Sequence, residues 1–326
     1  MSFAFNKPEQ LSPSTATRIL EVASALGYRP HPVARMLTQR RTMSIGIVTP
    51  QALSTTFANS FFGQFSEGVA LVAEEGGYGL TFIAPDRGSL ASALDRALVD
   101  GLVVVGLTAD HTEIDRIRTA GIPIVLVDST ALPGAPSIRV DDEGGGYDAA
   151  AHVLDLGHRD VLLLVIAPPA PYPPRRDHGV GPDRLRGYIR AFRDHGLDFP
   201  EHRRLSAPST IDGGRRAFAA AWESGLRPTA VIAMSDAIAI GVLSAARALD
   251  LRIPADLSIV GFDDIDVAAH TDPPLTTVHQ PIRRKGEAAM RVLLGLVEDA
   301  HRTPFEPPRL RTHLVVRGST GRPRES

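Results

Sequence analysis

Two carboxylate clusters in this chain have the residue types of ligand-binding loops without their spacing. The segment D-D-E-G-G-G at 141–146 precedes a helical stretch, as a phosphate-binding loop would. Neither G-x-x-x-x-G-K-[ST] nor G-x-G-x-x-G occurs there, so the pattern cannot cradle a nucleotide in either known way. The segment D-D-I-D at 263–266 lacks the glycine and the terminal glutamate of a calcium loop. Neither cluster therefore predicts a phosphate or calcium site.

The remaining candidate nucleophiles and metal ligands form no constellation either. The chain has no G-x-S-x-G elbow. His152 and His158, six residues apart across a helix end, do not have metal-ligand spacing. The absence of cysteine excludes disulfides and thiolate chemistry. We therefore predict that the protein is not an enzyme and has no catalytic residues, no metal site and no cofactor.

The composition is that of a protein with well-formed cores. The 326 residues suggest two globular domains, or one large domain and a small module. Hydrophobic residues make up 43% and charged residues 22%. The longest apolar runs, 161–167 and 102–107, are far shorter than the ~20 residues that span a bilayer. The N-terminal ten residues have no basic start, apolar stretch or cleavage site. We expect a cytoplasmic protein without membrane contact.

From Ser44 onward, short β-branched runs alternate with amphipathic stretches. Such alternation is typical of parallel sheets covered by helices on both faces. The length fits two α/β lobes, each a doubly wound parallel sheet, better than one long sheet. Buried strands are predicted at 44–48, 79–83, 101–105, 123–127, 161–165, 229–234 and 257–262, with a last strand at 313–317. Helices are predicted at 61–75, 90–98, 113–120, 147–156, 185–195, 215–224, 237–249 and 281–298, with a break at 141–146.

A small basic head precedes these lobes. Residues 1–43 carry six cations and two acidic residues, a balance of +4, and the rest of the chain sums to −6. A helix is predicted over 12–26, with Ser12 as N-cap and Pro13 as the first helical residue. A second, short helix could begin at Pro32, but nucleation costs too much for it to persist without a partner. The charge pattern suggests that only the head meets a polyanion; a solvated basic tail is the alternative.

A series of short motifs runs the whole length of the chain in a specific order. It includes G-Y-R-P-H-P-V-A-R-M-L (27–37), N-S-F-F (59–62), G-I-P-I-V-L-V-D (121–128), H-V-L-D-L-G-H-R-D-V (152–161), D-R-L-R-G-Y (183–188), S-D-A-I-A-I-G (235–241), S-I-V-G-F-D-D (258–264) and P-L-T-T-V-H-Q-P (274–281). Any one of these is weak evidence, but their order and spacing together are highly specific. In these motifs the chain resembles the LacI/GalR transcriptional repressors.

The resemblance implies that the head contacts operator DNA. The stretch 28–41 resembles the hinge helix that enters the minor groove of an operator. Leu37 then occupies the position that pries apart a base step. Phosphate contacts position such a protein without reading sequence. The DNA-contacting residues assigned by this resemblance are Asn6, Ser12, Thr15, Tyr28, Arg35 and Leu37.

The N-terminus departs from the family pattern. Family members begin with a helix-turn-helix whose second helix enters the major groove, and M-S-F-A-F-N matches only the end of that helix. A misassigned start codon and a genuine truncation are both open explanations. As written, the head is expected not to read bases. It should bind DNA only non-specifically and in a salt-sensitive manner.

For the rest of the chain, the resemblance implies a periplasmic-binding-protein-like domain that closes around a small ligand. Crossings between its lobes, expected near 141–147, 276–282 and 304–309, would act as hinges. The expected organisation is a head at 1–43 and an effector-binding domain at 44–326, with an N-lobe at about 44–146 and 282–306 and a C-lobe at about 147–281 and 307–326.

The expected effector is a sugar, and sugar recognition needs fork-shaped donors and carboxylates for hydroxyls. By resemblance, Arg184 and Asp263 hold the positions that grip the ligand, although Arg184 could instead pair with Asp183 or Asp177 at a helix start. The effector-binding residues assigned in this way are Phe61, Phe62, Asp128, Arg184, Ser235, Asp263 and Gln280.

Neighbouring side chains have expected structural roles. Phe61 fits the core and the ligand equally well, whereas Phe62 favours the ligand. Asp264 is expected to satisfy backbone groups, and Asp236 is expected to cap the helix at 237.

The predicted function is that of a dimeric DNA-binding transcriptional regulator. Its effector would shift the arrangement of the lobes and thereby the two hinge helices. The expected partners are operator DNA (if the native head is complete), a small carbohydrate effector and a second copy of the chain. A cytoplasmic sugar-binding module that no longer binds DNA is the main alternative. A periplasmic solute-binding protein is disfavoured by the missing signal segment and by residues 12–41.

Overall fold

The structure is a computed structural model. It describes residues 4, 10–27, 41–49, 51–85, 89–107, 113–119, 121–129, 132, 134–167, 180–298, 307 and 309–324. Within these ranges no helix has the length and apolarity needed to cross a membrane. The first described helix is α2 (Pro13–Ala25), whose N-cap is Ser12 and whose first residue is proline, as predicted.

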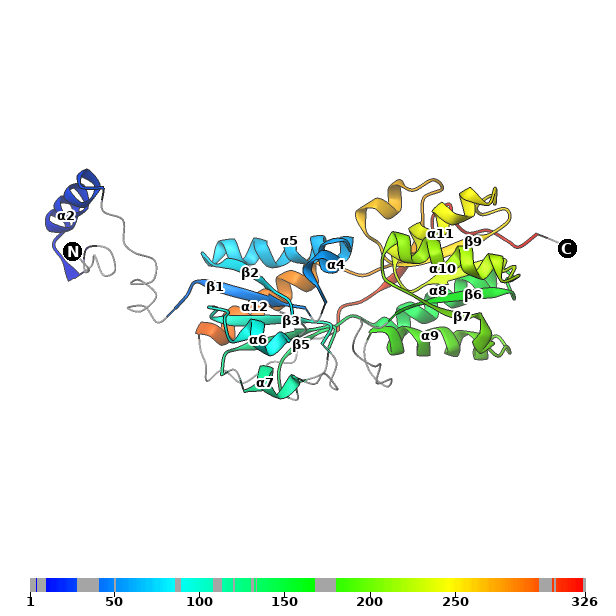
Figure 1. Cartoon of the computed structure of the whole chain (residues 1–326), viewed down its shortest axis with the longest axis horizontal. Coiled ribbons are helices and arrows are strands. Elements are labelled where there is room, and N and C mark those ends of the chain that lie inside the picture. Colours follow the sequence, from blue (N-terminus) through cyan, green and yellow to red (C-terminus); the bar gives the residue numbers. More distant parts are fainter. Residues whose placement is uncertain are drawn as a thin grey trace.

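Five parallel strands form the first sheet. Their spatial order is β2 (Gly79–Ile83), β1 (Ser44–Val48), β3 (Gly101–Val105), β4 (Ile124–Val127) and β5 (Ser137–Ile138). We call this sheet and its covering helices the N-lobe, shown in blue and cyan in Figure 1.

The second sheet repeats this order and adds one antiparallel edge strand. It runs β11 (His313–Val315), β10 (Thr276–His279), β9 (Ser258–Asp263), β8 (Ala230–Ala233), β6 (Val161–Ile166) and β7 (Arg204–Ala207). Only β11 is antiparallel to its neighbour. We call this sheet with its helices the C-lobe. The predicted fold class, two doubly wound α/β lobes, is confirmed.

The helix that follows the fifth strand of each sheet packs on the other lobe. α8 (Asp142–Asp155) follows β5 and packs against α9 (Val180–Asp194) of the C-lobe. α12 (Ile282–Glu298) follows β10 and packs against α5 (Ser60–Glu75) of the N-lobe. In Figure 1 the orange α12 accordingly lies among blue and cyan elements. The two lobes are thus joined by reciprocal crossings of the chain.

Glycines allow these helix pairs to approach closely. A Cβ on Gly146 of α8 would lie 2.5 Å from the carbonyl oxygen of Arg184, and one on Gly286 of α12 would lie 2.3 Å from that of Phe65. Any larger residue would push the helices apart. The predicted break at 141–146 is therefore wrong. Its glycines lie inside α8, where Gly146 is needed for the close approach to α9 and Gly145 lies against the side chains of Val278 and Phe262.

The other elements surround the two sheets, and the strands missed by the prediction are short or polar. β5 has two residues, β7 reads R-L-S-A, and β10 reads T-T-V-H. Such sequences lack the apolar run that marks a buried strand. The remaining elements are α4 (Leu53–Phe57), α6 (Leu90–Leu94), α7 (Ile114–Arg118), α10 (Ile211–Glu223), α11 (Asp236–Ala248) and the 3₁₀ turns η2 (Glu201–Arg203) and η3 (Asp266–His270).

Candidate functional site

Equivalent carboxylates end the fourth strand of each sheet. Asp128 directly follows β4, and Asp263 is the last residue of β9. Their φ angles, +53° and +128°, lie where residues other than glycine are strained. Strained backbone of this kind concentrates at functional sites, and the carboxyl ends of parallel strands are where α/β proteins bind ligands.

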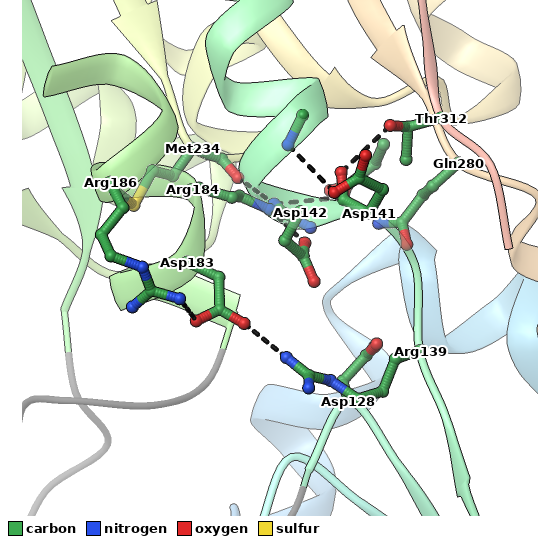
Figure 2. Close-up of polar contacts among 12 residues, drawn as sticks. Asp128, Arg139, Asp141, Asp142, Asp183, Arg184, Arg186, Met234, Gln280 and Thr312 are labelled. Carbon is green, nitrogen blue, oxygen red and sulfur yellow. Dashed lines mark hydrogen bonds and ion pairs between the residues drawn. The ribbon is translucent and has the colours of Figure 1, made fainter. Parts of the chain in front are cut away.

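In the C-lobe, one guanidinium gathers two carboxylates. Arg184 of α9 is 3% exposed. Its Nε donates to Asp142 Oδ1 at 2.9 Å, and its Nη1 donates to the Met234 carbonyl at 2.5 Å (Figure 2). Nη1 also lies 3.6 Å from Asp263 Oδ1, and the guanidinium carbon lies 3.5 Å from the centre of the Phe262 ring. We call Asp142, Arg184 and Asp263 the C-lobe half-site.

Part of this half-site has unused hydrogen-bonding capacity. Arg184 Nη2, Asp142 Oδ2 and Asp263 Oδ2 make no hydrogen bond within the described part of the chain. They are also absent from the fully buried unpaired atoms found there, which belong to Ser66, Tyr78 and Tyr188. One donor and two acceptors, from three different elements, can therefore still form hydrogen bonds with a ligand.

In the N-lobe, a lysine neutralises the carboxylate. Lys285 of α12 is fully buried, and its Nζ donates to both Asp128 oxygens at 2.8 Å and to Gln280 Oε1 at 2.6 Å. These three bonds use all the donors of an ammonium group. We call Asp128 and Lys285 the N-lobe half-site.

Gln280 connects the two half-sites. It lies at the crossing between β10 and α12 and is 2% exposed. Its Oε1 accepts from Lys285, and its Nε2 donates to Asp263 Oδ1 at 2.6 Å. The amide orientation is fixed by this pair of bonds, since only the oxygen can accept from an ammonium group. A continuous chain of polar contacts thus runs from Asp128 to Arg184.

Burial raises the pKa of carboxyls in the C-lobe. Burial, opposed chiefly by the charge of Arg184, raises the pKa of Asp263 to about 6. Burial and the neighbouring Asp263 raise the pKa of Asp236 to about 7. Burial also raises the pKa of Asp142. One guanidinium does not fully offset so many buried carboxylates.

Two carboxylates take other roles than predicted. Asp236 is not the cap of α11: Ser235 is the N-cap, and its Oγ accepts from the Ile238 amide. Asp236 instead accepts from the Ile265 amide at 2.9 Å and from Thr277 Oγ1 at 2.5 Å, because it lies beneath the turn after β9. Asp264 binds the side chains of His279 and Arg317, not backbone groups.

Ser235 lies beside the cluster without joining it. Its Oγ bonds to Ser209 Oγ at 2.9 Å, and Ser209 Oγ accepts from Asn59 of the N-lobe at 3.5 Å. No hydrogen bond within the described ranges links Ser235 to either half-site. One alternative partner for Arg184, Asp183, is occupied elsewhere: it pairs with Arg139, at 2.5 Å, and with Arg186. The other, Asp177, lies outside the described residues.

The two phenylalanines differ in burial. Phe62 is 8% exposed and belongs to the apolar core. Phe61 is half-buried, and its ring centre lies 5.3 Å from Lys285 Nζ. Phe61 therefore lies against the N-lobe half-site. A groove of about 400 Å³ opens nearby, between α5 and η3.

Of the predicted DNA-contacting residues, Ser12 and Thr15 are described. Both are exposed or half-exposed at the start of α2, where Ser12 Oγ bonds to Thr15 Oγ1 at 2.8 Å. The others, Asn6, Tyr28, Arg35 and Leu37, lie outside the described residues. Within the described ranges no three His, Asp or Glu side chains are grouped to hold a metal ion.

Sequence reasoning missed Lys285 and Asp142. Lys285 lies three residues after Ile282 and four before Ala289, both of them on the buried face of α12. A charged residue within an apolar stripe was a usable signal for a buried functional lysine. Asp142 belongs to the D-D pair of D-D-E-G-G-G, a pattern that by itself carries no signal for a side chain that binds Arg184.

Comparisons with known proteins agree with this architecture. Residues 150–320 match a periplasmic binding protein-like domain. The chain is 30% identical to the HTH-type transcriptional regulator CelR of Thermobifida fusca, over 98% of this chain and 93% of that regulator. It is also 30% identical to the HTH-type transcriptional repressor PurR of Aliivibrio fischeri, over 98% and 93%. A solved complex of CelR with cellobiose superposes with a TM-score of 0.74 at 28% identity, covering 98% of this chain and 94% of the other.

Proposed function

This chain belongs to the LacI family of transcriptional regulators, and we propose that it is a DNA-binding repressor controlled by a small carbohydrate bound between its lobes. It acts as a homodimer in the cytoplasm, where its operator DNA lies. It does not catalyse a reaction. The proposed organisation is a head at 1–43 that contacts DNA and an effector-binding domain at 44–326.

The observation that carries the effector proposal is the C-lobe half-site. The unused atoms of Arg184, Asp142 and Asp263 offer one fork-shaped donor and two acceptors. Adjacent hydroxyls of a sugar each donate and accept one hydrogen bond, so they match this set. The cellobiose bound by CelR supports the same class of ligand.

The proposed contacts come from both lobes. Arg184 and Asp263 bind hydroxyls, while Phe61 covers an apolar face of the sugar. Asp128 and Gln280 line the N-lobe side and the crossing. Phe62 and Ser235 lie behind these residues and also belong to the proposed site. Ser235 acts through its hydrogen bond to Ser209.

The head supplies the DNA-binding part of the proposal. Its contacts are Asn6, Ser12, Thr15, Tyr28, Arg35 and Leu37, and the +4 balance of residues 1–43 favours a polyanionic partner. The effector shifts the population of lobe arrangements and thereby changes the affinity for operator DNA, a coupling that is reciprocal.

The test combines melting temperatures with DNA release. Cellobiose, ribose, maltose and glucose are added to the full chain. A true effector at 100 times its Kd should raise the melting temperature by about 5 °C or more. The affinity of the full chain for duplex DNA, measured at low salt, should fall or rise on addition of the same sugar.

Two variants give this test its specificity. Asp263→Ala should abolish the sugar-induced rise in melting temperature, whereas Asp198→Ala, at an exposed position beyond the end of α9, should preserve it. If Asp263→Ala showed the same sugar-induced rise in melting temperature as the wild type, Asp263 would not belong to the site. The absence of any response to the four sugars would overturn the carbohydrate assignment.

A further inference from the structure

The crossing between β10 and α12 is held by side chains from both lobes. Gln280 receives a bond from Lys285, which packs with the N-lobe, and gives one to Asp263 of the C-lobe. The backbone at this point is also constrained, since the Ile282 amide donates to the Gln280 carbonyl at 2.8 Å. A hinge works by absorbing dihedral changes at a few residues, so a side chain bonded to both lobes resists its rotation.

Lys285 is more than a counter-charge for Asp128. A counter-charge needs only proximity, whereas two of its bonds grip both carboxylate oxygens and the third fixes the Gln280 amide. The lysine is fully buried, and its position on α12 is set by the close packing of the next residue, Gly286, against α5. The backbone that carries this ammonium group is therefore held against α5 of the N-lobe.

We propose that Lys285 is a positioning residue of the effector site, which fixes the crossing at 280–282 and thereby the separation of the two half-sites. This inference rests on the proposed function, because the separation of the two half-sites matters to a ligand that binds between the lobes. Arg139, which follows β5 at another crossing and binds Asp183 of α9 at 2.5 Å, gives that crossing a similar side-chain tie.

The separation of the lobes can be measured without knowing the effector. The chain has no cysteine, so Glu74→Cys on α5 and Glu223→Cys on α10 give one spin label on each lobe at exposed positions. Distances between the labels are recorded in the full chain without ligand. Arg283→Met, which removes an exposed arginine from the same helix, is the matched control.

Two further variants separate positioning from charge balance. Asp128→Asn removes the carboxylate charge but keeps the bond from Lys285 to Gln280, and asparagine tolerates the positive φ of this position. Lys285→Met with Asp128→Asn removes the whole ion pair, so it leaves no buried charge unpaired.

Positioning and charge balance predict opposite patterns. If Lys285 positions the crossing, Asp128→Asn and Arg283→Met keep the wild-type distance, and the double variant shifts it by more than about 2 Å or broadens it. If Lys285 only balances charge, the label distance is shifted or broadened in Asp128→Asn, and the double variant has the wild-type distance. The second pattern, or an unchanged distance in all variants, overturns the inference.

A sugar titration separates this inference from the proposed function. The same proteins are titrated with the four sugars while the melting temperature is followed. For any sugar that stabilises the wild type, the double variant should bind at least tenfold more weakly than Asp128→Asn. If no sugar stabilises the wild type, the carbohydrate assignment fails, and the label distances still decide the role of Lys285.

Discussion

The two half-sites occupy equivalent places at the ends of β4 and β9, but they balance their charges differently. In the N-lobe, one carboxylate meets one ammonium group, and every donor of Lys285 is used. In the C-lobe, Asp142 and Asp263 share the guanidinium of Arg184, and the buried Asp236 lies beneath them. The N-lobe half-site is complete without a ligand, whereas the C-lobe half-site is not.

This difference divides the work between the lobes. Unused donors and acceptors, together with a pKa of about 6 for Asp263, support our proposal that a hydroxyl-bearing ligand binds the C-lobe half-site. The N-lobe half-site has no such capacity on Lys285, so its contribution is to hold Asp128 and the crossing in place. Gripping and positioning are therefore expected to respond to different substitutions.

The largest expected effect comes from removing the shared cation. Arg184→Met leaves two buried carboxylates without their partner, which should lower the free energy of unfolding by about 3–5 kcal/mol. Urea denaturation at pH 7.5 measures it. Arg193→Met, an exposed position on the same helix, should change the free energy of unfolding by less than about 0.5 kcal/mol.

Rescue experiments sharpen the comparison. Adding Asp142→Asn to Arg184→Met should recover only part of the loss, because Asp263 remains charged and buried. Adding Asp128→Asn to Lys285→Met should recover most of the loss, because that pair is balanced. Full recovery in both lobes would contradict the difference in charge balance.

The next effect is a pH dependence confined to the C-lobe. Because the pKa of Asp263 is raised to about 6, the folded protein binds more protons than the unfolded chain between about pH 4 and 6. Stability is therefore lost as the pH rises through that window. Asp263→Asn mimics the neutral form, and we expect it to stabilise the protein by about 1–3 kcal/mol at pH 8 and to have little effect at pH 4.5.

The matching N-lobe substitution should have the opposite sign. Asp128→Asn leaves the buried Lys285 without its charged partner, so it should destabilise the protein at pH 8. Urea midpoints from pH 4.5 to 8 measure both. His158 contributes the reverse slope, because burial lowers its pKa and stability falls as the pH drops below the usual histidine range. This contribution of His158 is the same in all variants, so it cancels when their free energies of unfolding are compared.

Most of the fold could be predicted because buried parallel strands are continuous apolar runs. The limits of the buried strands β1 and β3 were predicted to the residue, and so were those of the edge strand β2, which is only partly buried. The start of α8 could not be, because three successive glycines indicate a break unless the close packing of Gly146 on α9 is known. Local sequence does not contain such a contact, and the same holds for the two-residue strand β5.

The site was only half predictable for a similar reason. Carboxylates at strand ends carry a local signal, and Asp128 and Asp263 were identified from it together with the family resemblance. Lys285 is 157 residues away from Asp128 in the sequence. Its place in the apolar stripe of α12 signals burial, but its pairing with Asp128 follows from the reciprocal crossings of the chain and not from its sequence neighbours.

The smallest expected effect concerns the weak hydrogen bond between the lobes from Asn59 to Ser209. Asn59 has two separable functions: its Oδ1 caps α5 by accepting from the Phe61 amide at 3.0 Å, and its Nδ2 donates across the lobes at 3.5 Å. Asn59→Ala loses both and should cost about 1 kcal/mol. Asn59→Asp keeps the cap, and it should change the free energy of unfolding by less than about 0.5 kcal/mol because the lost bond is long. If Asn59→Asp also shifted the distance between the lobe labels, the hydrogen bond from Asn59 to Ser209 would share the positioning role that we assign to Lys285.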